Sequence, residues 1–377
     1  MEKIRVAVLA CGRRARKVVG NLLNDSARQV EIAALYDPDP AEIEYAKEMW
    51  ETPDAAACAS VQEAIDFPGV TWVMVFSPNA FHHDQILAAF KAGKHVFSEK
   101  PIGTTIDDCV EIYEAYKASG RLFATGFVLR YAPIYQRVKE MLDSGKFGKL
   151  LSICAEENIP PYHGGYIMAN WRRNTAVSGP HILEKCCHDL DLINWFCNSK
   201  ASVVASFGGR DFYLPENDYM IQKYGKLTFG KWRDPHAQPS PFTSDKDLMD
   251  NQVAIFEYRN HVRVQFQCTM CNALPRRRMY LSCTEGTIIL ELYDRQIKYR
   301  MVGSDEENCI TFKSADGHGG GDAYIMKELF HTMTTGDEPK CSGSEGLESA
   351  ILALGIDQAA RTRSIVDLEP VWKKLHR

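Results

Sequence analysis

The 377-residue sequence lacks any apolar run approaching about eighteen residues, so nothing in it predicts a membrane-spanning helix. It also lacks an excess of positive charge, because 44 Lys and Arg residues stand against 49 Asp and Glu residues, a formal net charge of -5. A chain with this balance has no field suited to nucleic acid or to an anionic membrane. We therefore expect a small molecule, or further copies of the chain, as its partners.

No signal peptide is expected, since the chain enters a strand pattern directly at Ile4. Of its twelve cysteines, four occur in apolar strand or helix patterns, where reduced thiols serve as small core residues. That usage is typical of a reducing compartment. These features predict a cytoplasmic protein, with Cys154, Cys197, Cys268 and Cys283 in its core.

The cysteine and histidine spacings predict no metal site. Cys186, Cys187 and His188 are consecutive, and consecutive helical residues diverge by about 100° each, so they cannot converge on one ion. Cys268 and Cys271 have Cys-x-x-Cys spacing within an apparent strand, but no second pair accompanies them.

Two domains are expected at this length. In residues 1–127, about six short apolar strand patterns alternate with helical patterns, which favours a doubly wound parallel sheet covered on both faces. Residues 128–377 contain several short alternating strands in succession, which indicates an α/β domain with a large, mostly antiparallel sheet. The fold class predicted is α/β, with a Rossmann domain followed by this second domain.

The first strand pattern leads into a small-residue turn and a helix, and the second strand pattern ends at Asp37. Small residues let the backbone approach a pyrophosphate, and an acid at that place binds ribose hydroxyls. Asp37 favours NAD over NADP because it would repel a 2′-phosphate, although nearby arginines partly offset this. A purely structural βαβ turn is the alternative. The turn comprises Ala10, Cys11, Gly12, Arg13, Arg14 and Ala15.

Two further groups follow strand ends in the N-terminal half. Ser77, Pro78 and Asn79 follow the strand pattern at 71–76, where open α/β sheets bind ligands, and His82 begins the next helix. The next strand runs into Glu99, Lys100 and Pro101. A lysine beside a carboxylate and a residue of fixed φ is suited to holding an amine over a ligand.

In the C-terminal half, residues 179–195 have the pattern of one helix. Glu184 and His188 are one turn apart on it, as an acid–base pair requires, whereas a satisfied structural histidine is the alternative. Lys185 lies on another face but is long enough to reach a ligand. The glycine- and aromatic-rich segment 162–173 predicts a loop, for ring stacking or packing, and 213–247 shows no periodicity.

In chain order these motifs resemble the Gfo/Idh/MocA family of glucose–fructose oxidoreductase and inositol dehydrogenase-like enzymes. The resemblance implies a bound nicotinamide cofactor, a sugar or polyol substrate, and a homodimer or homotetramer formed through the outer face of the second sheet. It places Arg130, Trp171 and Arg172 beside the cofactor motifs already named, which include His82, Glu99, Lys100 and Pro101. It implies substrate contacts from Lys100, Arg172, Glu184, Lys185, His188 and His318, with Lys100, His188 and Glu184 as catalytic residues.

The predicted activity is that of an NAD(P)-dependent dehydrogenase, which transfers a hydride between the nicotinamide and a secondary hydroxyl of a sugar, glycoside or cyclitol. NADP is the less favoured cofactor. One alternative is an NAD-dependent glycoside-cleaving enzyme that oxidises C3 transiently and eliminates the aglycone. A second alternative is a non-catalytic regulator that senses sugar or NAD.

Overall fold

The computed structural model describes residues 3–230, 232, 237–313 and 318–377. The chain forms two compact units, of which the first comprises Met1–Ala132 with Gly320–Leu347 and the second Pro133–Gly319 with Glu348–Arg377. The division into domains at residues 127 and 128 stays a prediction.

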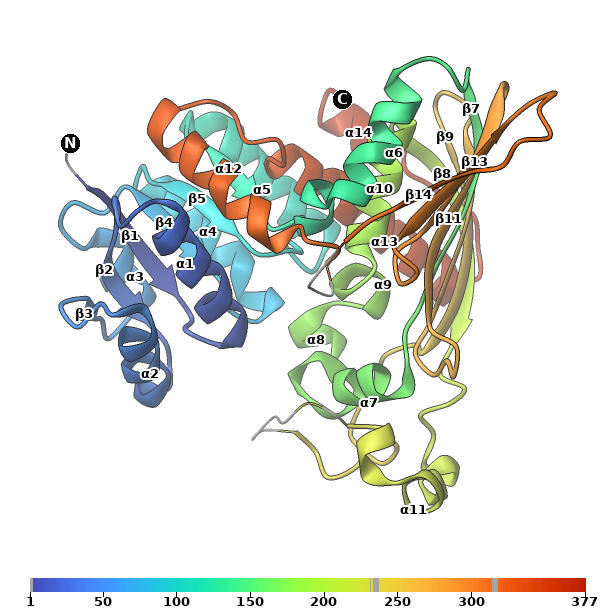
Figure 1. Cartoon of the computed structure of the whole chain (residues 1–377). Helices are drawn as coiled ribbons and strands as arrows, with labels where there is room; N and C mark the ends of the chain where they lie inside the picture. The colour runs from blue at the N-terminus through green and yellow to red at the C-terminus, as the bar shows by residue number, and fades with distance from the viewer. Residues whose placement is uncertain (1–2, 231, 233–236, 314–317) are drawn as a thin grey trace. The chain divides into compact units, whose positions relative to one another are not determined.

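The first unit is built on a six-stranded parallel sheet with the strand order β3-β2-β1-β4-β5-β6 (Figure 1). Its central strands are buried on both faces, as their continuous apolar sequences predict. The strands are β1 (Ile4–Leu9), β2 (Val30–Tyr36), β3 (Ala56–Ala57), β4 (Trp72–Val75), β5 (His95–Ser98) and β6 (Phe123–Thr125).

Local sequence determines where the helices of this unit begin. Asp39 caps α2 by accepting from the Ala41 N–H, and Thr105 caps α5 by accepting from the Asp108 N–H. The helices of the Rossmann order are α1 (Arg13–Asp25), α2 (Pro40–Trp50), α3 (Val61–Asp66), α4 (His82–Lys91) and α5 (Ile106–Ser119), with the short η1 (Asn79–Phe81) and η2 (Val128–Tyr131).

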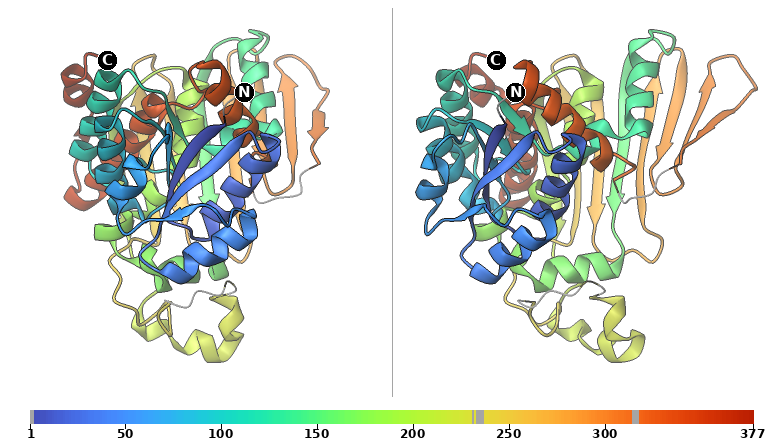
Figure 2. Two further views of the ribbon diagram at one scale, coloured as in Figure 1. Left: turned by 90° about the vertical axis from the view of Figure 1, so that its left-hand side faces the viewer. Right: turned by 60° about the vertical axis from the view of Figure 1, so that its left-hand side comes forward.

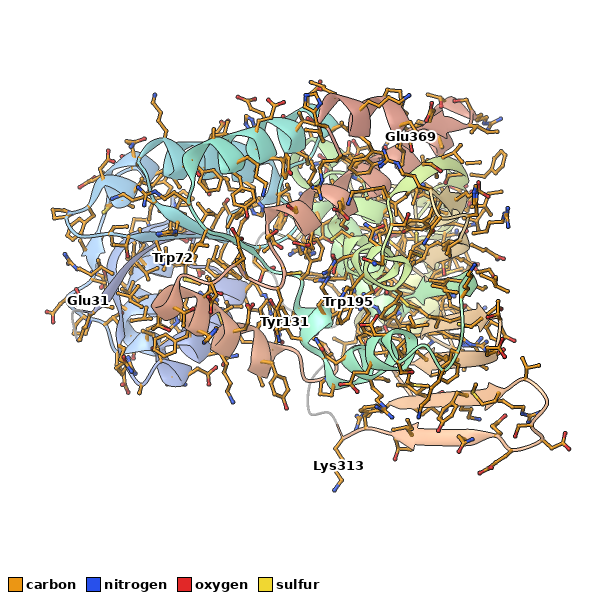
Figure 3. The ribbon with its side chains drawn as sticks, turned by 90° about the horizontal axis from the view of Figure 1, so that it is seen from above. Glu31, Trp72, Tyr131, Trp195, Lys313 and Glu369 are labelled. Carbon is orange, nitrogen blue, oxygen red and sulfur yellow. The ribbon has the colours of Figure 1, made fainter. Side chains whose placement is uncertain are left out.

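A helix from late in the chain, α12 (Asp322–Thr335), returns to pack on α1 and η2. Tyr131, which Figure 3 labels, donates from its hydroxyl to Glu328 of α12 at 3.0 Å. Helix α13 (Gly343–Thr362) then leads from the first unit into the second.

The second unit contains a nine-stranded sheet with the order β14-β13-β12-β11-β7-β10-β9-β8-β15. Figure 2 shows strands of this sheet side by side. All neighbours are antiparallel except β10 and β7. The strands are β7 (Leu150–Asn158), β8 (Ala201–Gly209), β9 (Asn251–Tyr258), β10 (Arg263–Thr269), β11 (Arg276–Cys283), β12 (Gly286–Glu291), β13 (Gln296–Met301), β14 (Asn308–Thr311) and β15 (Val366–Asp367). The predicted fold class is therefore confirmed.

Alternate residues of the second sheet are buried, so that only one of its faces packs against helices. The opposite face carries exposed apolar side chains, including Phe207 and Ile255, which are 66% and 62% exposed. The remaining helices are α6 (Pro133–Asp143), α7 (Pro161–Ala169), η3 (Trp171–Arg173), α8 (Thr175–Ser178), α9 (His181–Glu184), α10 (Cys187–Cys197), η4 (Pro215–Asn217), α11 (Tyr219–Tyr224), η5 (Lys226–Thr228) and α14 (Glu369–Lys374).

Three expectations from the sequence were wrong. Most of the segment at 162–173 is helical rather than a loop, because α7 begins with Pro161 in the first turn and buries Ile167 and Met168. The helix expected at 179–195 is two helices, since α9 ends at Glu184 and α10 begins at Cys187. Cys154 is exposed, because it lies on the outer face of β7.

Among the described residues, no helix combines the length and the apolarity that crossing a membrane requires. The three longest helices in this part of the chain, α13, α12 and α5, carry acidic residues in their first turns.

Candidate active site

The turn between β1 and α1 exposes backbone where the sequence predicts a pyrophosphate site. Gly12 has φ −64°, a conformation open to any residue, and a β carbon added there would meet no protein atom within 4 Å. Neither folding nor packing therefore requires glycine at this position. A glycine backbone at the N-terminus of α1 fits the close approach of a diphosphate.

Ala10 occupies the place of the usual first glycine and adopts the left-handed conformation with φ 70°. The tight turn after β1 requires this conformation, which costs a non-glycine residue on the order of 1 kcal/mol. The turn predicted from sequence is therefore present in spite of the alanine.

Asp37 is fixed against this turn. Its Oδ2 accepts the backbone N–H of Cys11 at 2.7 Å, and its Oδ1 accepts that of Asp39 at 2.9 Å. Each carboxylate oxygen retains a lone pair that a ribose hydroxyl can use. Burial, with a contribution from Asp37, raises the pKa of the Cys11 thiol to about 12, so this thiol stays protonated at neutral pH. The residues present therefore fit a dinucleotide.

The two arginines of the turn differ in their surroundings. Arg14 donates to Glu99 at 2.6 Å and to Asp322 at 2.8 Å, and Lys17 also pairs with Asp322. Arg13 is exposed and forms no ion pair with any of the residues that the structure describes. Because Arg14 is held by two carboxylates, its ability to offset the preference of Asp37 for NAD is reduced.

The strand ends at Ser77 and Lys100 are fastened together by one imidazole. His82 is 1% exposed, and its Nδ1 and Nε2 lie 2.7 Å from the Pro101 carbonyl and 2.8 Å from the Ser77 carbonyl. The Lys100–Pro101 peptide bond is cis. His82 therefore positions the Glu-Lys-Pro segment, and its nitrogens contact backbone oxygens rather than converging with other metal donors.

Three other residues of the first unit that are predicted to bind the cofactor are buried. Glu99 is 8% exposed and follows β5, where Arg14 holds it. Asn79 begins η1 directly after Ser77 and Pro78, and is 4% exposed. Arg130 lies in η2, 8% exposed.

In the second unit, Arg172 and Glu184 form an ion pair. The Arg172 Nε donates to Glu184 Oε1 at 2.8 Å, and its guanidinium lies 4.2 Å from the ring centroid of Trp171. The Tyr166 hydroxyl lies 3.4 Å from Arg172 Nη1. The predicted substrate residues Arg172 and Glu184 are therefore brought together, and the arginine partly neutralises the carboxylate that the sequence assigns to His188.

His188 lies in the first turn of α10 and is 6% exposed. The His318 ring lies near it, with 6.2 Å between the two ring centroids. These two predicted substrate residues are 130 positions apart in the chain (318 − 188), so only the fold of the second unit brings them together.

Lys185 belongs to a buried charge cluster that the sequence did not reveal. Its Nζ donates to Glu157 Oε1 at 2.6 Å, and Arg277 lies 3.3 Å from the same oxygen. Arg277 also forms two hydrogen bonds with Asp189, at 2.8 and 2.6 Å. Burial raises the pKa of Glu157, but Arg277 and Lys185 outweigh it and hold that pKa well below its usual range.

The only sequence signal of this cluster was strand alternation, which places Glu157 at an inward position of β7. The side-chain pairs bridge β7, β11 and the start of α10, so they depend on register rather than on local spacing. The cluster holds Lys185 and the first turn of α10 against the sheet, on either side of His188.

Two family models match this chain and identify its class of protein. Residues 4–127 match a family model described as "Oxidoreductase family, NAD-binding Rossmann fold", and residues 135–289 match the "GFO/IDH/MocA C-terminal domain". This chain is thus an oxidoreductase with an NAD-binding Rossmann fold. It belongs to the Gfo/Idh/MocA family.

Individual relatives agree with this placement. The chain is 31% identical to a 1,5-anhydro-D-fructose reductase of Ensifer adhaerens, over 82% of this chain and 83% of the relative. It is 32% identical to an inositol 2-dehydrogenase of Gluconacetobacter diazotrophicus, over 45% and 47% of the two chains. A levoglucosan dehydrogenase solved with NADH and levoglucosan shares the fold, with a TM-score of 0.81, 15% identity, and coverage of 97% and 99%.

Proposed function

We propose that this protein is an NAD-dependent dehydrogenase that acts on a secondary hydroxyl of a sugar, glycoside or cyclitol. The choice of NAD rests on two residues at the same turn. Gly12 leaves the backbone of the turn accessible, and Asp37 is held there as an acceptor for ribose hydroxyls. The substrate class rests on the family and on the substrates named for its members.

When bound, the nicotinamide accepts or returns a hydride. The protein must hold the carbinol, and must remove or return its hydroxyl proton. We assign these tasks to Lys100 and His188. Lys100 follows β5 in a segment that His82 and Arg14 fasten, and His188 is held by the first turn of α10. Either group can exchange a proton with a hydroxyl, and a well-placed acid–base group contributes about a hundred- to ten-thousandfold to the rate.

Arg172 and Glu184 are proposed to bind the sugar. Arg172 offers guanidinium N–H donors and Glu184 offers carboxylate acceptors at one place, and the hydroxyl groups of a polyol match that mixture of donors and acceptors. Lys185 and His318 are assigned to neighbouring hydroxyls. Trp171 and Arg130 are assigned to the cofactor, as the family resemblance implies.

The experiment is a panel of sugars, glycosides and inositols incubated with NAD or NADP and followed at the nicotinamide absorbance. A dehydrogenase accumulates reduced cofactor, with NAD preferred. A glycoside-cleaving enzyme would release the aglycone without net NADH, and a sensor would bind ligands without turnover.

The assignment of residues needs variants that keep the shape of the side chains. We expect Lys100→Met and His188→Asn each to lower kcat at least about a hundredfold. NAD affinity, measured by calorimetry, should change by less than about threefold. The control is Lys94→Met, whose amine contacts the Val70 carbonyl 2.8 Å away and has no assigned catalytic task. Near-normal turnover in both active-site variants would contradict the assignment.

A further inference from the structure

Three donor side chains from separate parts of the second unit converge in its core. They are His181 at the start of α9, Cys186 just before α10, and Cys268 of β10. Their donor atoms all lie within 4.8 Å of one another. The three residues are 4%, 0% and 2% exposed, so the cluster is shielded from solvent.

We propose that His181, Cys186 and Cys268 form a binding site for a zinc-type divalent cation. One imidazole and two thiolates are a donor set that Zn²⁺ favours over harder ions such as Mg²⁺ or Ca²⁺. Zinc bonds of about 2.0–2.3 Å bring donor atoms to within about 4 Å of one another, so the observed cluster needs only small side-chain adjustments. Three protein ligands leave a fourth position for water.

The charge of the bound state balances. Binding forms two Zn–S bonds and one Zn–N bond, and the two thiols release their protons to solvent. The dication then faces two thiolates, so the change adds no net charge to the core. Since protons are released, the affinity must rise with pH.

The surroundings contain an acceptor suited to a metal-bound water. Glu157 of β7 is the register partner of Cys268 on the adjacent parallel strand, and it is fully buried. Its Oε1 accepts a hydrogen bond from Lys185 and forms an ion pair with Arg277. Its Oε2 has no hydrogen-bond partner among the residues that the structure describes. A buried carboxylate oxygen in that condition is costly unless it accepts a hydrogen bond, and a metal-bound water supplies one.

The location suggests what the ion would do. His181 lies in α9, Cys186 lies in the break between α9 and α10, and Cys268 lies on strand β10 of the sheet. An ion shared by all three would lock the break to β10. Because His188 is two residues beyond Cys186, this ion would position the helix turn that carries the proposed catalytic histidine. It is a structural site, separate from the hydride chemistry.

The first test uses the wild-type full-length protein and no variant. After chelation and buffer exchange, the chain is titrated with Co²⁺ and then with Zn²⁺. We expect one Co²⁺ per chain, with a thiolate-to-cobalt charge-transfer band and the intense d–d bands of tetrahedral coordination. Stoichiometric Zn²⁺ should abolish these bands and raise Tm by at least about 2 °C. A titration without charge-transfer bands would overturn the proposal.

Variants then locate the ion. Cys186→Ser and Cys268→Ser should each weaken Co²⁺ binding at least a hundredfold, whereas Cys187→Ser, one residue from the cluster, should leave it unchanged. A Cys154→Ser/Cys309→Ser variant removes two exposed thiols and should retain the full spectrum. Thiolate bands that survive in both cluster variants, or that vanish with the exposed thiols, would place the ion elsewhere and refute the site. These readouts do not depend on dehydrogenase activity.

Discussion

Among single residues, Gly12 separates cofactor binding from folding most cleanly. Because a β carbon at this position meets no protein atom, Gly12→Ala should change the free energy of unfolding by less than about 1 kcal/mol. The same methyl group would stand where the diphosphate approaches the backbone. We expect NAD affinity, measured by calorimetry, to fall at least tenfold. Unchanged affinity would show that the cofactor does not approach this turn.

A second residue-scale prediction concerns acid stability. Burial, followed by the charge of Lys185, lowers the pKa of His163 to about 3, whereas an unfolded histidine titrates near about 6.5. Between these values the unfolded chain binds the proton and the folded chain does not, so stability falls as pH falls. The His163 contribution lost between pH 7 and pH 5 is about 1–2 kcal/mol. Denaturant unfolding of His163→Asn should show a flatter pH profile by that amount, and an identical profile would contradict it.

Short motifs explain why many of the proposed site residues could be found in the sequence. Gly12, Asp37 and the Glu-Lys-Pro segment each follow the end of a strand. The end of an apolar run in the sequence predicts where such a strand ends. Arg172 with Glu184, and His188 with His318, meet through tertiary structure, and only the family resemblance placed them in one site. For the cluster around Glu157, strand alternation gave only the inward position of Glu157, because its partners lie on another strand and near the start of α10.

At the scale of elements, the buried arginine of β11 should matter far more than its neighbour. Arg277 is 3% exposed and pairs with both Glu157 and Asp189, so Arg277→Gln leaves the buried Asp189 without its cation and leaves Glu157 with Lys185 alone. We expect a loss of about 3–5 kcal/mol in the free energy of unfolding. The matched control is Arg276→Gln on the same strand, whose surface pair with Glu156 should contribute less than about 1 kcal/mol. Equal effects in denaturant unfolding would contradict the role of the cluster.

Elements were predicted well where periodicity was strong and poorly where the chain changes direction. Five of the six strands of the first sheet follow from their apolar runs, whereas the two-residue strand β3 was not predicted. The break between α9 and α10 was missed because apolar spacing continues through Lys185 and Cys186, and tertiary contacts to the sheet decide it instead. The return of α12 to the first unit had no signal in its own sequence, since an amphipathic helix does not specify which surface it will cover.

At the scale of the whole molecule, we propose self-association through the exposed face of the second sheet. Phe207, Ile255 and Tyr280 lie on that face and are 66%, 62% and 38% exposed. Contiguous apolar surface of this kind marks an interaction site. A Phe207→Lys/Ile255→Glu variant should convert a dimer or tetramer to monomers in sedimentation velocity. Charged substitutions at exposed Leu274 and Val302 provide the control, and a wild-type monomer at micromolar concentration would contradict the proposal.

The central claim is that an amine and an imidazole act on one carbinol beside the nicotinamide. The most direct measurement is a crystal structure of the protein with NAD and a turned-over polyol or its unreactive analogue. The account predicts Lys100 Nζ and one His188 ring nitrogen both within about 3.2 Å of the same carbinol oxygen. A complex in which either nitrogen lies far from that oxygen, with the carbinol carbon still facing the nicotinamide, would contradict it.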